Sequence, residues 1–206
     1  MTPQASLILA SSSPYRRALL ERLGLPFTAV SPGIDETLRP GESPEEAVQR
    51  LAAAKADRVA ADHATALVIA SDQLAVLNGD ILAKPGDRDR ARRQLAAMAG
   101  QRVRFLTGLC VRNGDRDSRQ TDCVTCSVVF RDYSADEIER YLDAEAPYDC
   151  AGAFKSERLG IALVREMQGP DPTALVGLPL IKLAEMLRRE GLAVAGQSGR
   201  SSFPGG

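Results

Sequence analysis

A turn rich in hydroxyl groups is the first segment of this sequence whose residue types could do chemistry. The serines Ser11, Ser12 and Ser13 are followed by Pro14 and, after one residue, by Arg16. If this turn opens a helix, hydroxyl and backbone N–H donors lie at the positive end of the helix dipole, with a guanidinium group one turn inside. The arrangement is typical of a phosphate site. A serine cap followed by solvated arginines would look the same in a sequence, so this alternative stays open.

Acidic and basic side chains at four later positions could complete a phosphoryl-transfer site. Asp72 follows an apolar run, Glu36 lies in an acidic loop, and Lys55 and Lys84 are the lysines nearest to them in the chain. Such chemistry needs oxygen ligands for a divalent cation, a group that activates water, and cations that offset charge on the leaving group. All three types are present, although exposed acids and surface lysines would also give this pattern.

Lysine is scarce in this chain, which favours a role for the few lysines it has. Of the 26 basic residues, 22 are arginine. The four lysines are Lys55, Lys84, Lys155 and Lys182. A chain that otherwise uses arginine can keep lysine where a compact ammonium group is needed, as phosphate sites often require. The alternative is that they are ordinary solvated lysines.

Composition excludes several classes of protein. The chain has 206 residues, 44% of them hydrophobic, and a net charge of −1. Binding to long DNA or RNA is disfavoured, because such proteins usually carry a basic excess. The longest apolar runs, Leu67–Ala70 and Leu178–Ile181, are far shorter than the roughly 20 residues of a membrane helix. Charged residues interrupt the first 30 positions, so no signal peptide is expected and a cytoplasmic location is predicted.

Four cysteines raise the question of a metal site or disulfides. Cys123 and Cys126 have the C-x-x-C spacing, but their neighbours favour a strand, in which residues three apart point to opposite faces. Two thiolates so placed cannot easily share a zinc ion. Buried or inert thiols are therefore expected at these positions and at Cys110 and Cys150.

The apolar periodicity predicts the elements that position these residues. Strands are expected at Leu7–Ala10, Phe27–Val30, Leu67–Ala70, Val103–Val111, 117–130 and Ile161–Arg165. Helices are expected after the serine turn 11–14, after the caps Ser43 and Ser134, over Asp87–Met98, and over Leu180–Glu190. A hairpin is predicted at Leu74–Leu77 with its turn at Asn78–Asp80. Asp72 is therefore expected at the end of a strand.

This order of elements predicts a mixed α/β protein. Residues 1–194 are expected to form one domain. Residues 195–206, rich in glycine and serine, are expected to be a disordered tail.

Five ordered motifs resemble those of the Maf family of nucleotide pyrophosphatases, over nearly the whole chain from Leu7 to about Leu192. They are LILASSSPYRRALLERLG at 7–24, GIDET at 33–37, SDQL at 71–74, KPG at 84–86 and VGLPLIKL at 176–183, with the pair Ala54–Lys55 between them. The resemblance implies an α/β fold of the Maf/ITPase-like type, in which an elongated mixed β-sheet is flanked by helices and two lobes of the domain lie around a central cleft. It also implies a divalent metal cation, Mg²⁺ or Mn²⁺, as cofactor, and a homodimer.

The resemblance further implies roles for single residues. Asp72 falls on the family's proton acceptor, and hydrolysis between the α and β phosphates is the expected reaction. Ser11, Ser13, Arg16, Glu36, Lys55 and Lys84 fall on its other active-site positions, with Asp72 and Glu36 as metal ligands. Tyr15, Gln73, Lys155 and Glu157 fall on substrate positions, of which Tyr15, Gln73 and Glu157 set base preference. Three positions, Tyr15, Ala153 and Arg158, depart from the pattern, where Trp, Ser and Gly are expected.

Gln73 and Glu157, in SDQ and YDCAGAFKSE, resemble the branch of the family that acts on 7-methyl-GTP. N7-methylation makes guanine cationic, so an aromatic face attracts it and a carboxylate both offsets its charge and accepts from its N1 and N2 donors. Tyr15 and Glu157 have this chemistry. Because tyrosine attracts cations less than tryptophan, a preference over GTP near the low end of about 5-fold to 30-fold is expected. The alternatives are a nucleotide-binding regulator of cell division, a dTTP or UTP pyrophosphatase, and an enzyme of broader specificity.

Overall fold

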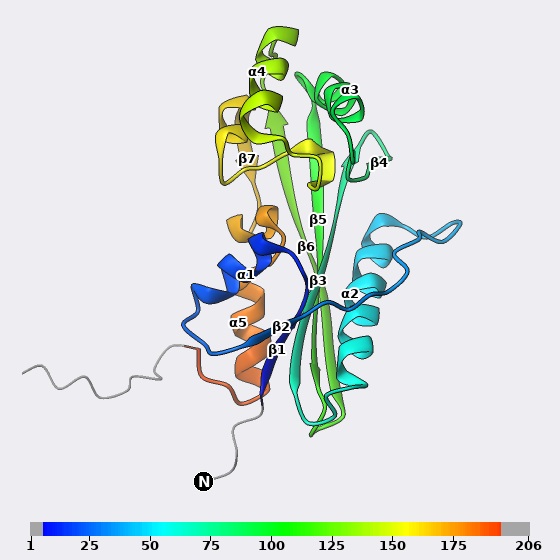
Figure 1. Ribbon diagram of the computed structural model, residues 1–206, viewed down its shortest axis with the longest axis vertical. Helices are drawn as coiled ribbons and strands as arrows, with labels where there is room; N and C mark the ends of the chain where they lie inside the picture. The colour runs from blue at the N-terminus through cyan, green and yellow to red at the C-terminus, as the bar shows by residue number, and fades with distance from the viewer. Residues whose placement is uncertain (1–5, 195–206) are drawn as a thin grey trace, which may run out of the picture.

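The fold is built on a single mixed sheet, seen in a computed structural model that describes residues 6–194. Its strands follow the order β2 (Thr28–Val30), β1 (Leu7–Ala10), β3 (Leu67–Leu77), β5 (Arg102–Asn113), β6 (Ser118–Phe130) and β7 (Val164–Gln168). A seventh strand, β4 (Asp80–Leu82), pairs with β3 beside this path. The predicted tail at 195–206 lies outside the described residues. The mixed α/β class expected from the sequence is confirmed, and the sheet is elongated, with helices on both faces (Figure 1).

Three long antiparallel strands form the centre of the sheet. They are β3 (Leu67–Leu77), β5 (Arg102–Asn113) and β6 (Ser118–Phe130). β3 pairs with β5 along ten positions, and Asp72 lies opposite Gly108. The expected strand end at Asp72 is therefore wrong: β3 continues for five residues beyond it, because Leu74–Leu77 alternate between the two buried faces of the sheet and extend the same ladder.

Helix α2 (Pro44–Ala60) covers one face of the central strands. Ser43 caps it in a capping box with Glu46, as the sequence predicts. The helix backbone lies directly on β5, since a Cβ added at Gly108 would lie 2.1 Å from the carbonyl oxygen of Val48. Only glycine permits this approach, which brings the buried side of α2 close to Asp72 on the neighbouring strand.

The opposite face is covered by two separate groups of elements (Figure 1). One group consists of α1 (Pro14–Glu21) and α5 (Leu180–Arg189), which share an apolar core with β1 (Leu7–Ala10) and the first half of β3. The other group contains α3 (Arg88–Met98), α4 (Ala135–Glu145) and the short helix η1 (Ala151–Ala153), packed on the second half of β3. The cores of the two groups are distinct, so the sheet is the platform they share.

The remaining elements connect these groups. They are β2 (Thr28–Val30), β4 (Asp80–Leu82), β7 (Val164–Gln168), η2 (Leu159–Leu163) and η3 (Pro172–Val176). The hairpin turn at Asn78 and Gly79 is confirmed, and both residues have positive φ. The strand expected at Ile161–Arg165 begins later, at Val164, because η2 occupies Leu159–Leu163 and the ladder with β6 starts only at Phe130.

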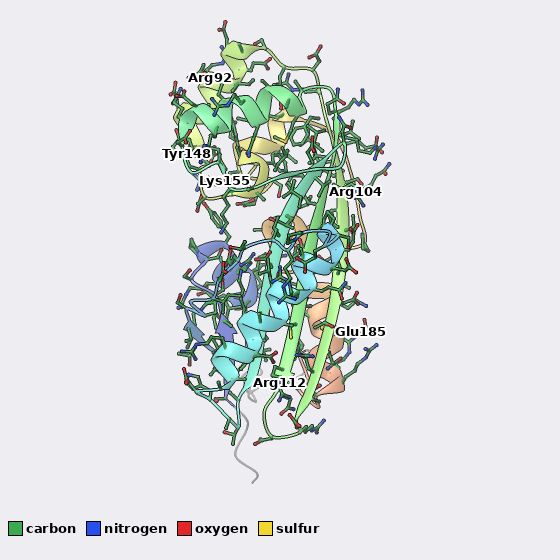
Figure 2. All side chains as sticks on the ribbon, turned by 90° about the vertical axis from the view of Figure 1, so that its right-hand side faces the viewer. Arg92, Arg104, Arg112, Tyr148, Lys155 and Glu185 are labelled. Atoms are coloured by element: carbon green, nitrogen blue, oxygen red, sulfur yellow. The ribbon has the colours of Figure 1, made fainter. Side chains whose placement is uncertain are left out.

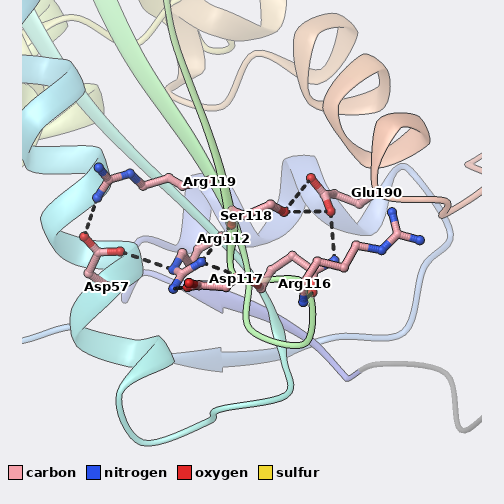
Figure 3. Close-up of polar contacts among 8 residues, drawn as sticks. Asp57, Arg112, Arg116, Asp117, Ser118, Arg119 and Glu190 are labelled. Atoms are coloured by element: carbon pink, nitrogen blue, oxygen red, sulfur yellow. Dashed lines mark hydrogen bonds and ion pairs between the residues drawn. The ribbon is translucent and has the colours of Figure 1, made fainter.

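At the end of the sheet away from α3 and α4, polar contacts hold the β5–β6 turn (Figure 3). Asp57 of α2 pairs with Arg119, and Glu190 after α5 accepts hydrogen bonds from Asn113 and Ser118. These contacts join α2, the turn and α5. Along β6, Cys123 packs on the α2 side and Cys126 lies in the core of the opposite face, as strand alternation predicts, and all four cysteines are free thiols.

Candidate active site

A cleft of about 610 Å³ opens between α1, the loop before α2, the Lys84 loop and the segment around η1. Elements from both groups of helices line it. Except for Lys155, every site residue predicted from the sequence lies in its lining: Ser11, Ser13, Tyr15, Arg16, Glu36, Lys55, Asp72, Gln73, Lys84 and Glu157. The structure therefore brings together residues that are up to 146 positions apart in the chain.

Lys55 joins the two acidic residues of the cleft. Its ammonium nitrogen lies 2.6 Å from Asp72 Oδ1 and 2.7 Å from Glu36 Oε1. Lys55 and Asp72 are buried, whereas the side chain of Glu36 is half exposed. Burial alone would raise the pKa of Glu36, but its hydrogen bond and ion pair with Lys55, helped by Lys84 and Arg16, hold that pKa below its usual value. Both carboxylates are thus fixed by one cation.

The serine turn has the predicted geometry at the start of α1. Ser13 is the N-cap, and its hydroxyl accepts a hydrogen bond from the backbone N–H of Arg16. Ser11 is buried, and its hydroxyl accepts from the N–H of Ser13 at 3.1 Å. Ser11 therefore rigidifies the turn, while the first helical turn faces the cleft with its positive dipole end.

Arg16 reaches from α1 across to the segment after η3. Its Nε donates a hydrogen bond to the carbonyl oxygen of Gly177 at 3.0 Å. Burial lowers the pKa of Arg16, and the negative charges of Asp72 and Glu36 oppose that effect. Together with Lys55 and Lys84, Arg16 gives the cleft three cationic side chains that can offset the charge of these carboxylates and of a bound anion.

Lys84 lies on a loop that is tied to both neighbouring elements. Gln94 of α3 donates to the carbonyl oxygen of Ala83 at 2.9 Å, and the N–H of Gly86 donates to the carbonyl oxygen of Tyr148 at the same distance. These bonds fix the loop on each side of Lys84. The ammonium group is consequently presented to the cleft from the group of helices opposite α1.

Tyr15, Gln73 and Glu157 lie in the cleft lining, but the side-chain amide nitrogen of Gln73 is hydrogen-bonded within the protein. Its amide nitrogen donates to the carbonyl oxygens of Ala174 and Leu175 and to the hydroxyl of Thr107. Gln73 thus holds η3 against β3. Glu157 is exposed and forms no ion pair or hydrogen bond among residues 6–194.

Lys155 lies behind the cleft lining, near Tyr148 in the group of elements around α3 and α4 (Figure 2). Its buried ammonium group donates to the carbonyl oxygen of Glu145 at 2.8 Å and lies 5.7 Å from the centre of the Tyr15 ring. Burial alone would lower the pKa of Lys155, but its hydrogen bond with Tyr15 and the nearby acids raise it. The structure therefore makes Lys155 a support for Tyr15.

Three cleft or support residues were missed by sequence reasoning. Asp149 and Cys150 line the cleft near Tyr15, and Ser71 is completely buried behind it. Asp149 and Cys150 lie inside the segment YDCAGAFKSE, and Ser71 lies inside SDQL, so the motifs mark the segments but not the side chains that face the cleft. Burial and the neighbouring Asp149 raise the pKa of the Cys150 thiol to about 12, which leaves it protonated at neutral pH.

The donor set of the cleft fits a divalent cation only if the substrate supplies further ligands. The described part of the chain has no cluster of three acidic, cysteine or histidine side chains that could hold a metal ion. Asp72 and Glu36 each use one carboxylate oxygen on Lys55, and the second oxygen of each accepts no hydrogen bond within residues 6–194. Two carboxylate oxygens plus phosphate oxygens and water make a set that Mg²⁺ commonly accepts.

Comparison with known proteins adds the family context. The chain matches the family described as Maf-like protein over residues 6–190. It is 56% identical to a 7-methyl-GTP pyrophosphatase of Pseudomonas syringae pv. tomato, covering 92% of this chain and 98% of the relative. It is 57% identical to one of Ralstonia nicotianae (88% and 94%) and 53% identical to one of Pseudomonas aeruginosa (91% and 98%). Among solved structures, the Staphylococcus aureus Ham1 protein is similar with a TM-score of 0.45 and 17% identity, covering 62% of this chain and 72% of that one.

Proposed function

The chain belongs to the Maf family, and on this basis we propose that it hydrolyses 7-methyl-GTP to 7-methyl-GMP and diphosphate. Three relatives that carry this activity in their names share more than half of their residues with the chain over most of their length. The observation that carries the proposal is the cleft itself, which joins four carboxylates, three cationic side chains and the Tyr15 ring.

The cleft is polar in a way that suits this substrate. Arg16, Lys55 and Lys84 supply positive charge for the polyphosphate tail. Tyr15 and Glu157 supply an aromatic face and a carboxylate for a ring that carries a positive charge after N7-methylation. The anionic phosphate tail would therefore contact cationic side chains, and the cationic base would contact a carboxylate.

In the proposed reaction, the oxygen of a water molecule forms a bond to the α phosphorus and the bond from that phosphorus to the bridging oxygen breaks. Asp72 takes one proton from the water, and Lys55 holds the carboxylate of Asp72 in position. Arg16 binds the phosphate tail, and Lys84 offsets the negative charge that develops on the departing diphosphate. Glu36 and Asp72 would hold a divalent cation, which would polarise the phosphates when bound.

The proposal is tested by a substrate panel. Purified protein is assayed with Mg²⁺ or Mn²⁺ against 7-methyl-GTP, GTP, dTTP and UTP, and diphosphate release is measured. We expect kcat/KM for 7-methyl-GTP to exceed that for GTP by about fivefold or more, because the cationic ring adds attraction to Tyr15. Faster release from dTTP or UTP would assign the enzyme to the other branch. Tight nucleotide binding with metal present but no product over hours would favour the cell-division regulator.

The location and assembly of the protein remain predictions. Within the described residues, no helix has both the length and the apolar character to cross a bilayer. A cytoplasmic location, which the residue pattern predicts, and a homodimer, which the family resemblance implies, are part of the proposal.

A further inference from the structure

One buried hydroxyl group behind the cleft, that of Ser71, takes no part in the chemical steps of the proposed reaction. Ser71 precedes Asp72 on β3, and the two side chains point to opposite faces of the sheet. Asp72 meets Lys55 on the α2 side, whereas Ser71 is fully buried and donates a hydrogen bond to the carbonyl oxygen of Gly177 at 2.7 Å.

The same carbonyl oxygen also accepts from Arg16. Arg16 Nε lies 3.0 Å from it, so the two lone pairs of the Gly177 oxygen are used by one hydroxyl and one guanidinium group. Arg16 has four further N–H donors on Nη1 and Nη2, and these donate to no protein acceptor within residues 6–194. Fixing Nε thus leaves the forked end of the side chain, which matches phosphate oxygens, available to the cleft.

Gly177 is built to hold this carbonyl. Its φ is +110°, a conformation that favours glycine, and an added Cβ would also lie in tight contact with Arg16, 3.3 Å from Nε. The adjoining segment is locked by Asp171, whose carboxylate accepts from the N–H of Thr173 at 2.9 Å and of Ile181 at 2.7 Å. The carbonyl is therefore held rigidly between η3 and α5.

We propose that Ser71 is a positioning residue for phosphate binding: through the Gly177 carbonyl it holds Arg16 so that Nη1 and Nη2 face the polyphosphate tail. This inference rests on the proposed function for the identity of the tail. The role is separate from proton transfer at Asp72, because the Ser71 hydroxyl bonds to the Gly177 carbonyl whereas the Asp72 carboxylate bonds to Lys55.

The test measures phosphate binding apart from base binding. Inorganic diphosphate and 7-methylguanosine, which has no phosphate, are each titrated calorimetrically into the wild-type protein and into Ser71→Ala at constant Mg²⁺. We expect Ser71→Ala to weaken diphosphate binding by about three- to tenfold, the range for losing one hydrogen bond, and to leave 7-methylguanosine binding unchanged. Ser71→Cys, which keeps a weak donor of similar size, should restore part of the lost affinity.

A double-mutant cycle decides whether Ser71 acts through Arg16. In an Arg16→Ala background, Ser71→Ala should change diphosphate affinity by less than about twofold, because the group it positions is gone. Ser118→Ala is the matched control, since it removes a hydroxyl hydrogen bond to Glu190 at the far end of the sheet (Figure 3). It should leave diphosphate affinity unchanged.

Kinetics give a second measurement on the same variants. Because Arg16 is expected to hold the tail equally in the bound substrate and the transition state, Ser71→Ala should raise KM while kcat changes little. The proposal is overturned if Ser71→Ala leaves diphosphate affinity intact, if both ligands weaken equally, or if the effect persists without Arg16. If wild-type protein binds diphosphate but does not hydrolyse 7-methyl-GTP, the proposed function fails while this inference stands.

Discussion

At the scale of single residues, the site depends on a lysine that holds two acids. Lys55 contacts Asp72 and Glu36 at 2.6 Å and 2.7 Å, and removing one partner of a buried ion pair usually destabilises a protein by several kcal/mol. An amide at position 72 is milder than a truncation, because its oxygen can still accept from Lys55 and Glu36 keeps its charge. Asp72 can therefore be tested without dismantling the site.

We expect Asp72→Asn to lower kcat by about 10²- to 10⁴-fold, the usual contribution of a general base, because an amide cannot take a proton from water. Nucleotide binding should persist, since Arg16 and Lys84 remain. The measurement is diphosphate release alongside calorimetric binding of 7-methyl-GTP. Cys150→Ser serves as the control, because the thiol lines the cleft but is protonated and has no proposed part in the reaction. Turnover within tenfold of wild type in Asp72→Asn would remove Asp72 from the role of base.

The sequence could predict which residues lie together in the cleft, but not which hydrogen-bond partners each side chain has. Charge type and motif position identified Lys55, Lys84 and Asp72, because their chemistry can be read from the residue itself. The use of Gln73 and Lys155 could not be read, since both donate to backbone carbonyls of segments about 100 and 10 positions away. Such partners are fixed only by tertiary packing.

At the scale of elements, the sequence predicts the start of a helix where a local cap sets it. It does not predict the end of a strand where pairing with a distant strand sets it. Ser43 and Ser134 begin helices through capping boxes, which are local and visible in the sequence. β3 extends past Asp72 because β5 pairs with it over ten residues, and the polar Ser71, Asp72 and Gln73 looked like a strand end. Long-range pairing has no local signature.

The contact between α3 and α4 gives a prediction with a defined pH dependence. Glu139 of α4 pairs with Arg92 and, at 2.6 Å, with Arg88, and these bonds lower the pKa of Glu139 from 4.5 to about 2. A carboxylate with a depressed folded-state pKa stabilises the fold above its unfolded pKa, and this contribution is lost as pH falls from about 4.5 to about 2. Glu139→Gln should therefore have a lower urea midpoint than wild type at pH 5–7, with the difference disappearing by about pH 2.

Urea titrations at several pH values measure this difference, and added salt should reduce it because the pair is partly exposed. Asp132→Asn is the matched control, as Asp132 is exposed and forms no ion pair within the described residues. It should have the wild-type midpoint at pH 7. A Glu139→Gln difference that is equally large at pH 2 and pH 7 would contradict the ion-pair origin.

At the scale of the whole molecule, the cleft lies between two groups of helices that pack on the same face of the sheet. Ser11, Tyr15 and Arg16 come from the β1–α1 side, whereas Lys84 and Asp149 come from the side of α3 and η1. Their apolar cores are distinct. A nucleotide whose phosphates contact cations from both sides would therefore connect the two groups. Its binding should stabilise each of them.

This connection predicts how ligands change the free energy of unfolding and the rate of backbone hydrogen exchange. In Asp72→Asn, which binds without turnover, 7-methyl-GTP at 100 times its Kd should raise the free energy of unfolding by about 2.7 kcal/mol. For a chain of this length, that corresponds to a rise in Tm of about 5–11 °C.

Hydrogen exchange should slow in both 10–16 and 148–154, because the ligand contacts both sides of the cleft. 7-Methylguanosine at the same multiple of its own Kd should give a similar Tm rise but leave exchange at Lys84 unchanged, since it has no phosphates to reach that loop. Protection by 7-methyl-GTP confined to one side would contradict a ligand that spans the cleft.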